Sequence, residues 1–154
     1  MFKAHRFSTS RPSIYSFVSS ACQQFCKEQQ IGDPDAFIKS FEVHADGFEN
    51  ACNLNRDLHW EFGVDKELTP MFIEDLGDLS FKISWEHHKA VLKWAEENPA
   101  TPWPVGTRVS FIRRNKEVEG TIEEAMEGHR YVINQDNYSP GKPVIPFEDV
   151  TIVQ

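Results

Sequence analysis

The chain has 154 residues, enough for one ordinary domain or two small ones. Hydrophobic residues make up 40% and charged residues 26% of the chain, a balance that excludes a fully disordered protein. The formal net charge of -8 excludes non-specific nucleic-acid binding through bulk charge, because neutralising phosphates requires a basic face.

The charge is unevenly distributed along the chain. Residues 1–32 carry a net +3, residues 33–100 carry -9 with 15 acidic and 6 basic side chains, and residues 101–154 carry -2. Apolar runs are only a few residues long, so no transmembrane helix fits, and the N-terminus has no apolar signal-peptide region. The cysteine count is odd, with Cys22, Cys26 and Cys52, which favours reduced thiols and a cytoplasmic location.

The first 32 residues predict a short leading segment and then one helix with one buried face. Residues 1–9 read as a weakly ordered start or an edge strand. Ser10 or Ser13 can cap the helix, and Gly32 stands where its C-cap would be. The apolar residues that follow recur at helical intervals of three and four: Ile14, Phe17, Val18, Ala21, Cys22, Phe25 and Cys26.

Two further cap-plus-proline pairs predict helix starts. Asp33-Pro34 begins a helix expected over about 34–57, with a break near Asp46-Gly47, and Thr69-Pro70 begins a short helix expected to end at Gly77. The alternation over residues 79–83 predicts a short strand that pairs with the first residues of the chain. A last helix is expected from Ser84 to Asn98-Pro99.

The remaining residues predict a small β-barrel behind a proline-rich linker. We expect a mainly helical domain over 1–98, the linker over 99–105 and a five-stranded barrel over 106–154, so the fold class is α+β. Strands are expected near 107–111, 118–123, 131–133, 144–147 and 150–153. Gly120 stands inside the second strand, where it predicts a bend or bulge.

Three features of this unit carry a resemblance to known barrels: Gly106 before Arg108, the Gly120-Thr121-Ile122 step, and Pro146-Phe147-Glu148-Asp149-Val150 before the last strand. Together they resemble the SH3-like small barrels, the group of KOW and Tudor-type domains, over about a third of the chain. The resemblance implies binding of proteins, peptides or nucleic acids rather than catalysis by the barrel alone. No family is recognised for residues 1–100.

The predicted binding surface is basic and lies on barrel loops. The densest basic cluster is Arg113, Arg114 and Lys116, between the first two strands, where it could contact phosphates or an acidic protein surface. The alternative is a solvated hairpin loop balanced by neighbouring glutamates. The full set of candidate binding residues is Arg108, Arg113, Arg114, Lys116, Arg130 and Tyr138.

A second candidate surface is acidic and lies in the middle of the chain. It could imitate nucleic-acid phosphates and occupy a partner's basic groove, although an ordinary solvated surface is favoured. Its residues are Asp57, Glu61, Asp65, Glu67, Glu74, Asp75 and Asp78.

Neither a metal site nor a catalytic site is expected. Cys22 and Cys26 share a helix face at a spacing that zinc could use, but they coincide with the apolar stripe and read as small buried residues. Glu86, His87 and His88 are adjacent on one helix and point in different directions, with His88 expected in the core-facing register and His87 exposed. We expect no cofactor.

The sequence therefore predicts a non-enzymatic binding or adaptor protein with a protein or nucleoprotein partner. Direct nucleic-acid binding through residues 108–116 and an acidic inhibitor that competes with nucleic acid remain open as alternatives. An enzyme with a pocket near Trp60, His87 and Trp103 ranks last. The sequence does not indicate an oligomeric state.

Overall fold

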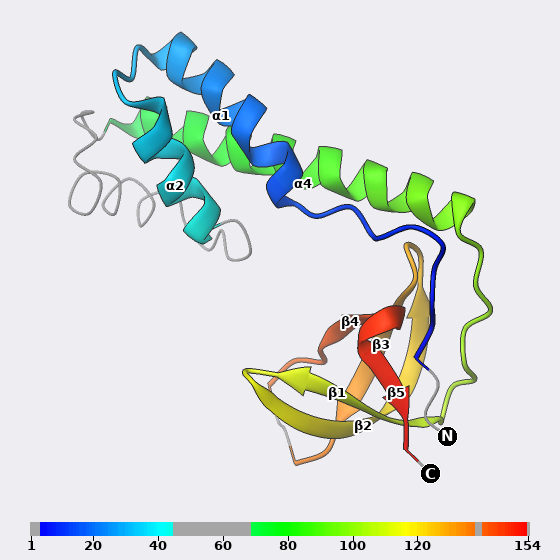
Figure 1. The fold of residues 1–154 in the computed structure, drawn as a ribbon. Coiled ribbons are helices and arrows are strands. Elements are labelled where there is room, and N and C mark those ends of the chain that lie inside the picture. Colours follow the sequence, from blue (N-terminus) through cyan, green and yellow to red (C-terminus); the bar gives the residue numbers. More distant parts are fainter. Residues whose placement is uncertain (1–3, 45–68, 138–139, 154) are drawn as a thin grey trace. The chain divides into compact units, whose positions relative to one another are not determined.

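The computed structural model describes residues 4–44, 69–137 and 140–153. Three helices come first in this part of the chain, α1 (Tyr15–Gln29), α2 (Pro34–His44) and α4 (Pro70–Glu97) (Figure 1). A five-stranded antiparallel sheet follows, which confirms the predicted α+β class. Its elements are β1 (Arg108–Arg113), β2 (Lys116–Met126), β3 (Arg130–Gln135), β4 (Val144–Pro146), the 3-10 turn η1 (Phe147–Asp149) and β5 (Val150–Ile152).

The chain packs as two compact units. The helical unit is Pro12–Ala90, and the sheet unit combines Met1–Arg11 with Val91–Gln154. Helix α4 contributes its residues 70–90 to the first unit and 91–97 to the second. The domain limits predicted at residues 98 and 106 remain a prediction, because these units are defined by packing alone.

Two of the predicted helix starts are confirmed by their caps. The Asp33 carboxylate accepts a hydrogen bond from the Ala36 amide at 3.0 Å, and the Thr69 hydroxyl accepts one from the Phe72 amide at 3.1 Å. Each cap satisfies one of the amide groups that a helix start leaves unpaired. The predicted continuation of α2 over residues 45–57 lies outside the described residues.

At the start of α1 the predicted Ser13 hydroxyl accepts a hydrogen bond from the Tyr15 amide at 3.3 Å, and the predicted end of the helix needs correction. The helix starts after Ile14, which makes no side-chain cap. It ends with Gln30 in the left-handed conformation (φ 58°) rather than at Gly32. Gln30 takes this conformation because its amide and that of Ile31 both donate to the Cys26 carbonyl, which closes the last turn.

The strand predicted over residues 79–83 is wrong, because this segment is the middle of α4. The buried residues of the helix continue through it at steps of four, three and four, at Phe72, Leu76, Leu79 and Ile83, while Phe81 is 71% exposed. The alternation was therefore a fragment of a helical pattern read over too few residues. Gly77 and Ser84, predicted to end and start helices, both lie within α4, which ends before Asn98 as expected.

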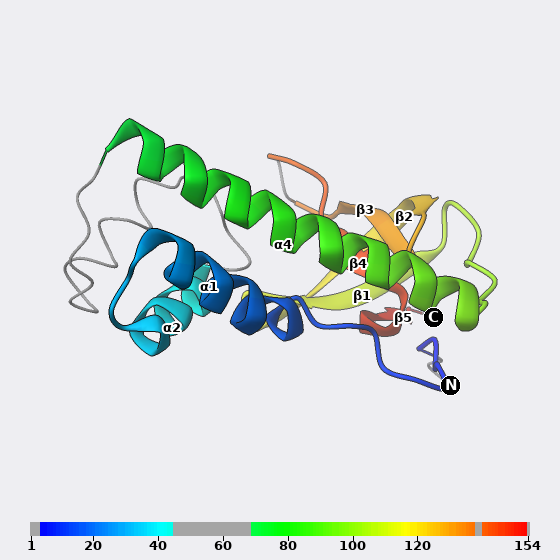
Figure 2. The same ribbon diagram turned by 90° about the horizontal axis from the view of Figure 1, so that it is seen from above.

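The core of the helical unit lies between α1, α2 and the first half of α4. Figure 2 shows these three helices from above. It is mainly aromatic and aliphatic, and three phenylalanine rings stack in series, Phe25 on Phe37 and Phe37 on Phe41. Cys22 and Cys26 are both buried in this core, at 0% and 1% exposure. They pack there as small apolar residues.

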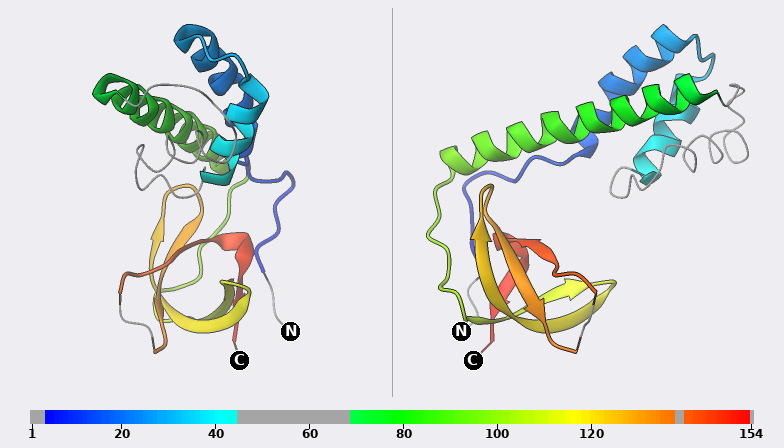
Figure 3. Two further views of the ribbon diagram at one scale, coloured as in Figure 1. Left: turned by 90° about the vertical axis from the view of Figure 1, so that its left-hand side faces the viewer. Right: turned by 180° about the vertical axis from the view of Figure 1, so that it is seen from behind.

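The sheet has the strand order β4-β3-β2-β1-β5, with every neighbouring pair antiparallel. It is strongly curled into a half-barrel, as both panels of Figure 3 show. All five predicted strands and the helical turn before the last one are confirmed. The sheet unit has its own core of buried residues: Val109, Phe111, Ile122, Tyr131, Ile133, Phe147 and Val150.

Gly120 is required by close packing rather than by a bulge. A Cβ atom there would lie 2.6 Å from both the Asn134 carbonyl oxygen and the Ile133 side chain. The register shift in β2 comes later, between Ile122 and Glu124. The predicted bulge is therefore present in this strand but displaced from the glycine.

Residues 4–11, which we call the strap, pack on the sheet unit without forming helix or strand. They are not part of the sheet, so the predicted edge strand is wrong for the described residues. Side-chain hydrogen bonds hold the strap instead, and they join it to residues more than 80 positions away in the sequence.

Candidate functional site

The basic cluster lies on the β1–β2 hairpin, which closes in a two-residue turn. Arg113 pairs with Lys116, and the two residues between them, Arg114 and Asn115, have φ values of 51° and 61°. Two successive left-handed residues are typical of the type I′ turn, whose twist matches that of antiparallel strands. The turn therefore places three cationic side chains within four residues.

A pocket of about 340 Å³ opens beside this turn. Arg113 donates a hydrogen bond to the Gln135 side-chain oxygen at 2.7 Å, which fixes the guanidinium at the pocket. The lining combines these cations with one aliphatic side chain, and its residues are Arg113, Arg114, Lys116, Val118 and Gln135. Such a lining suits a carboxylate or phosphate group attached to a small apolar group.

Arg108 is engaged within the sheet and does not join the pocket. Its guanidinium donates two hydrogen bonds to the Asp136 carboxylate, at 2.8 and 2.5 Å, and one to Glu119 at 3.1 Å. The hydrogen bond to Asp136 is the main reason that the pKa of Arg108 is raised, and the same bond lowers the pKa of Asp136. Two carboxylates thus neutralise Arg108.

Arg130 lies at the far end of β2 from the pocket. It pairs with Met126, which is ten residues along that strand from Lys116. Its Nε donates to the Glu127 carbonyl at 3.2 Å. Of the six predicted binding residues the structure therefore brings together three, Arg113, Arg114 and Lys116, and Tyr138 lies outside the described residues.

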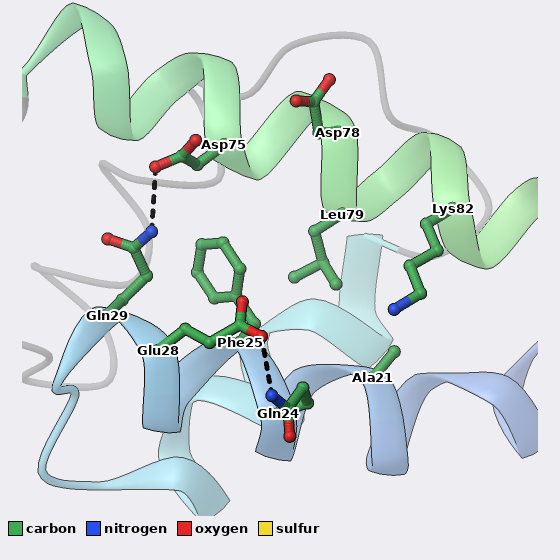
Figure 4. A pocket seen from close by; sticks show the side chains of 9 residues that line it. All are labelled: Ala21, Gln24, Phe25, Glu28, Gln29, Asp75, Asp78, Leu79 and Lys82. Atoms are coloured by element: carbon green, nitrogen blue, oxygen red, sulfur yellow. Dashed lines mark hydrogen bonds between the residues drawn. The ribbon is translucent and has the colours of Figure 1, made fainter.

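Part of the predicted acidic surface lies in a groove between α1 and α4. Figure 4 shows a pocket of about 200 Å³ there, with Asp75, Asp78 and Lys82 extending from α4. Asp75 accepts a hydrogen bond from the Gln29 side chain at 2.9 Å. Glu74 is exposed on α4, and the other predicted acidic residues, Asp57, Glu61, Asp65 and Glu67, lie outside the described residues.

One histidine of α4 lies differently from the expectation. His87, predicted to be exposed, is half-buried and donates from Nε2 to the Pro12 carbonyl at 2.9 Å. It continues the buried steps of four from Ile83. His88 is half-buried as well, and its ring lies 5.9 Å from that of Trp85, which is 51% exposed.

Sequence reasoning did not place Gln135 or Val118 at the basic pocket. Gln135 is 22 residues from Arg113, and only the β2–β3 pairing brings its side chain to the turn. The geometry shows no group of three or more His, Cys, Asp or Glu side chains placed to hold a metal within the described residues. Cys52 lies outside those residues.

No helix in the described ranges is both long and apolar enough to cross a membrane. Comparison with protein-family models, curated proteins and solved structures gives no match for this chain.

Proposed function

We propose that this chain is a binding protein that docks an acidic segment of a protein partner on the β1–β2 hairpin. The observation that carries the proposal is the pocket formed by Arg113, Arg114 and Lys116, with Val118 and Gln135. Val118 is the aliphatic side chain of that lining. A pocket that combines three cations with one aliphatic side chain fits a partner that combines carboxylates with apolar side chains.

The resemblance to SH3-like barrels supports a recognition role, since barrels of that group bind peptides, proteins or nucleic acids through their loops. The curled five-stranded sheet is compatible with that resemblance. A rigid sheet that presents a charged hairpin is a common arrangement for binding. We propose the same use for this hairpin.

An acidic protein segment is favoured over nucleic acid by two features of the sheet unit. Nucleic-acid backbones need a row of cations, but Arg108 is neutralised by Asp136 and Glu119 and Arg130 is remote. Single strands also need exposed aromatic rings for stacking, and the sheet's own rings are buried: Phe111, Tyr131 and Phe147. Direct nucleic-acid binding is therefore the second candidate.

Fluorescence anisotropy on the full chain tests the proposal with two labelled probes, a ten-residue glutamate peptide and a single-stranded oligonucleotide. We expect the peptide to bind more tightly than the oligonucleotide. Replacing Arg113, Arg114 and Lys116 by Gln should weaken peptide binding by at least about tenfold, because the charge-assisted hydrogen bonds are lost.

The matched control removes the same charge from exposed helix positions, with Lys27→Gln, Lys39→Gln and Lys93→Gln. The control should retain peptide binding if the hairpin is the site. Equal losses in both triple variants would contradict a specific hairpin site. Tighter, hairpin-dependent binding of the oligonucleotide, with a steep salt dependence, would favour the second candidate.

A further inference from the structure

The strap is held to the sheet unit in the manner of a bound peptide. His5, Phe7 and Arg11 are half-buried against the unit, while Arg6 and residues 8–10 are exposed and the chain bends at Ser8 and Thr9. Three separated side chains thus anchor the strap, as anchor side chains that fit pockets hold a bound peptide. The surface beneath the strap is formed by Trp94, Asn98, Trp103, His129, Tyr131, Phe147 and Glu148.

Arg11 occupies a site that matches a guanidinium on every side. Its Nε and Nη2 donate to the two carboxylate oxygens of Glu148, at 2.6 and 3.0 Å. Nη1 donates to the Gly128 carbonyl at 2.7 Å and Nη2 to the His129 carbonyl at 2.9 Å. The guanidinium carbon also lies 4.6 Å from the centre of the Trp94 ring. This combination of a bidentate carboxylate, carbonyls and an aromatic face selects arginine over lysine.

The two upstream anchors bind aromatic rings of the same surface. The Phe7 ring stacks on His129 with centroids 5.4 Å apart and meets Trp94 edge-on at 4.7 Å. The His5 ring lies 4.5 Å from Trp103 and 4.9 Å from Phe147. Aromatic rings bury large apolar areas, so we expect His5 and Phe7 to supply affinity for the surface and Arg11 to supply specificity.

Two main-chain groups of the strap, both of Thr9, form hydrogen bonds with side chains rather than with a strand. The Thr9 amide donates to Asn98 Oδ1 at 3.3 Å, and the Trp94 indole donates to the Thr9 carbonyl at 3.1 Å. A segment held by side chains can leave without breaking the sheet ladder. Beyond Arg11 the chain passes into the helical unit.

We propose that the strap is an exchangeable, intramolecular ligand and that the surface beneath it is a binding site for an arginine-containing peptide. The peptide it takes has two aromatic side chains at alternate positions and an arginine four residues after the second. The strap competes with such a peptide from a local concentration of roughly millimolar. This site is separate from the basic hairpin and does not depend on the function proposed for it.

The test uses the full chain and a fluorescent synthetic peptide of residues 4–11. We compare the wild-type chain with the strap variant Phe7→Ala/Arg11→Ala, whose own strap is weakened. The variant should bind the peptide at least about tenfold more tightly, because a larger fraction of its surface is open. The control Arg6→Ala/Ser10→Ala changes exposed positions of the same strap and should bind like the wild type.

Two changes examine the arginine site itself. Adding Glu148→Gln to the strap variant should remove most of the gained binding, and a peptide with Arg11→Lys should bind the strap variant at least about tenfold more weakly than the original peptide. Equal peptide binding by wild type, strap variant and control would overturn the proposal. Binding that survives both Glu148→Gln and Arg11→Lys unchanged would also overturn the arginine site.

A second measurement needs no substitution and remains decisive if the strap variant does not fold. In the nitrogen-15 spectrum of the wild-type chain, excess unlabelled peptide at roughly millimolar concentration should shift the amide signals of residues 5–11 toward those of a free segment. The Trp94 indole signal should stay, because the peptide restores the bond to a Thr9 carbonyl. Strap signals that do not move at this concentration would show a fixed strap and overturn the proposal.

Discussion

The cores of the helical unit and the sheet unit are built on different principles. The helical core is a set of apolar side chains at helical spacing, joined by phenylalanine stacking. The sheet core continues into a hydrogen-bonded aromatic cluster centred on Tyr131, which is fully buried. Its hydroxyl oxygen accepts from the Trp103 amide at 2.7 Å and lies 3.0 Å from His5 Nε2.

This difference separates two sources of specificity. A core of apolar side chains depends mainly on total volume and tolerates conservative exchange. A core that includes buried hydroxyl and imidazole groups depends on each hydrogen bond being made, because an unpaired buried polar group is costly. The stability of the helical unit should therefore depend most on the volume of its side chains. The stability of the sheet unit should depend most on the position of its backbone and on which groups are protonated.

The largest effect is expected from removing volume in the helical core. Phe37 is fully buried and stacks on two neighbouring rings, so Phe37→Ala should lower the free energy of unfolding by about 3–5 kcal/mol. Urea denaturation followed by circular dichroism measures the change. Phe81→Ala is the matched control, since that ring is 71% exposed on α4, and it should stay within about 0.5 kcal/mol of wild type. Similar losses in both variants would show that the core of this unit lies elsewhere.

A smaller effect is expected from adding one methyl group to the sheet. Gly120→Ala brings a Cβ against the Asn134 backbone and should cost about 1–3 kcal/mol, because the neighbouring strand must move. The same exchange at Gly77, in α4, meets no atom within 4 Å and should instead stabilise by about 0.5–1 kcal/mol. Thermal melts of the two variants would contradict this contrast if both midpoints moved in the same direction.

The smallest effect is a loss of stability in mild acid caused by His5. The Tyr131 hydroxyl accepts from the Trp103 amide and lies 3.0 Å from His5 Nε2, so its own hydrogen can be donated to an unprotonated Nε2. Burial and then the neighbouring His129 lower the pKa of His5 below 6.5, while Glu148 opposes this shift. The unfolded state therefore binds more protons than the folded state, and the free energy of unfolding should fall as the pH drops through 6.5.

Urea midpoints between pH 7.5 and about 5.5 measure this dependence for the wild type and His5→Gln. The variant should give the flatter curve. Arg11, His129, Glu148 and Asp149 are the other charged or titratable groups of this cluster. Burial and then Glu148 raise the pKa of Asp149, an effect of opposite sign that acts at lower pH. If the urea midpoints of wild type and His5→Gln changed in parallel with pH, His5 would not be the cause of the acid sensitivity.

Local patterns were sufficient for the parts of the fold that local chemistry determines. Asp33 and Thr69 cap helices as predicted, and the strand positions after Gly106 follow from alternation and turn residues. The strand expected near Phe81 failed because five alternating residues fit both a strand and a longer helical repeat. Only the packing against α1 and α2 decides between them.

How well each candidate site could be predicted also depended on how far apart its residues lie in the sequence. Arg113, Arg114 and Lys116 are neighbours in sequence, so their clustering was visible without a structure. The neutralisation of Arg108 depends on Asp136, 28 residues away, and the Arg11 site depends on Glu148, 137 residues away. Side-chain pairing at such separations has no signature in composition or periodicity.

The left-handed conformation of Arg114 in the β1–β2 turn sets stability against the recognition role that we propose for this side chain. Glycine or asparagine takes a φ of 51° at little cost, whereas a long side chain there is disfavoured by roughly 1 kcal/mol. In a library randomised at this position, selection for heat tolerance should enrich glycine and deplete arginine. Selection for partner capture should enrich arginine, and opposite outcomes of the two selections would identify the turn as a binding element from sequence counts alone.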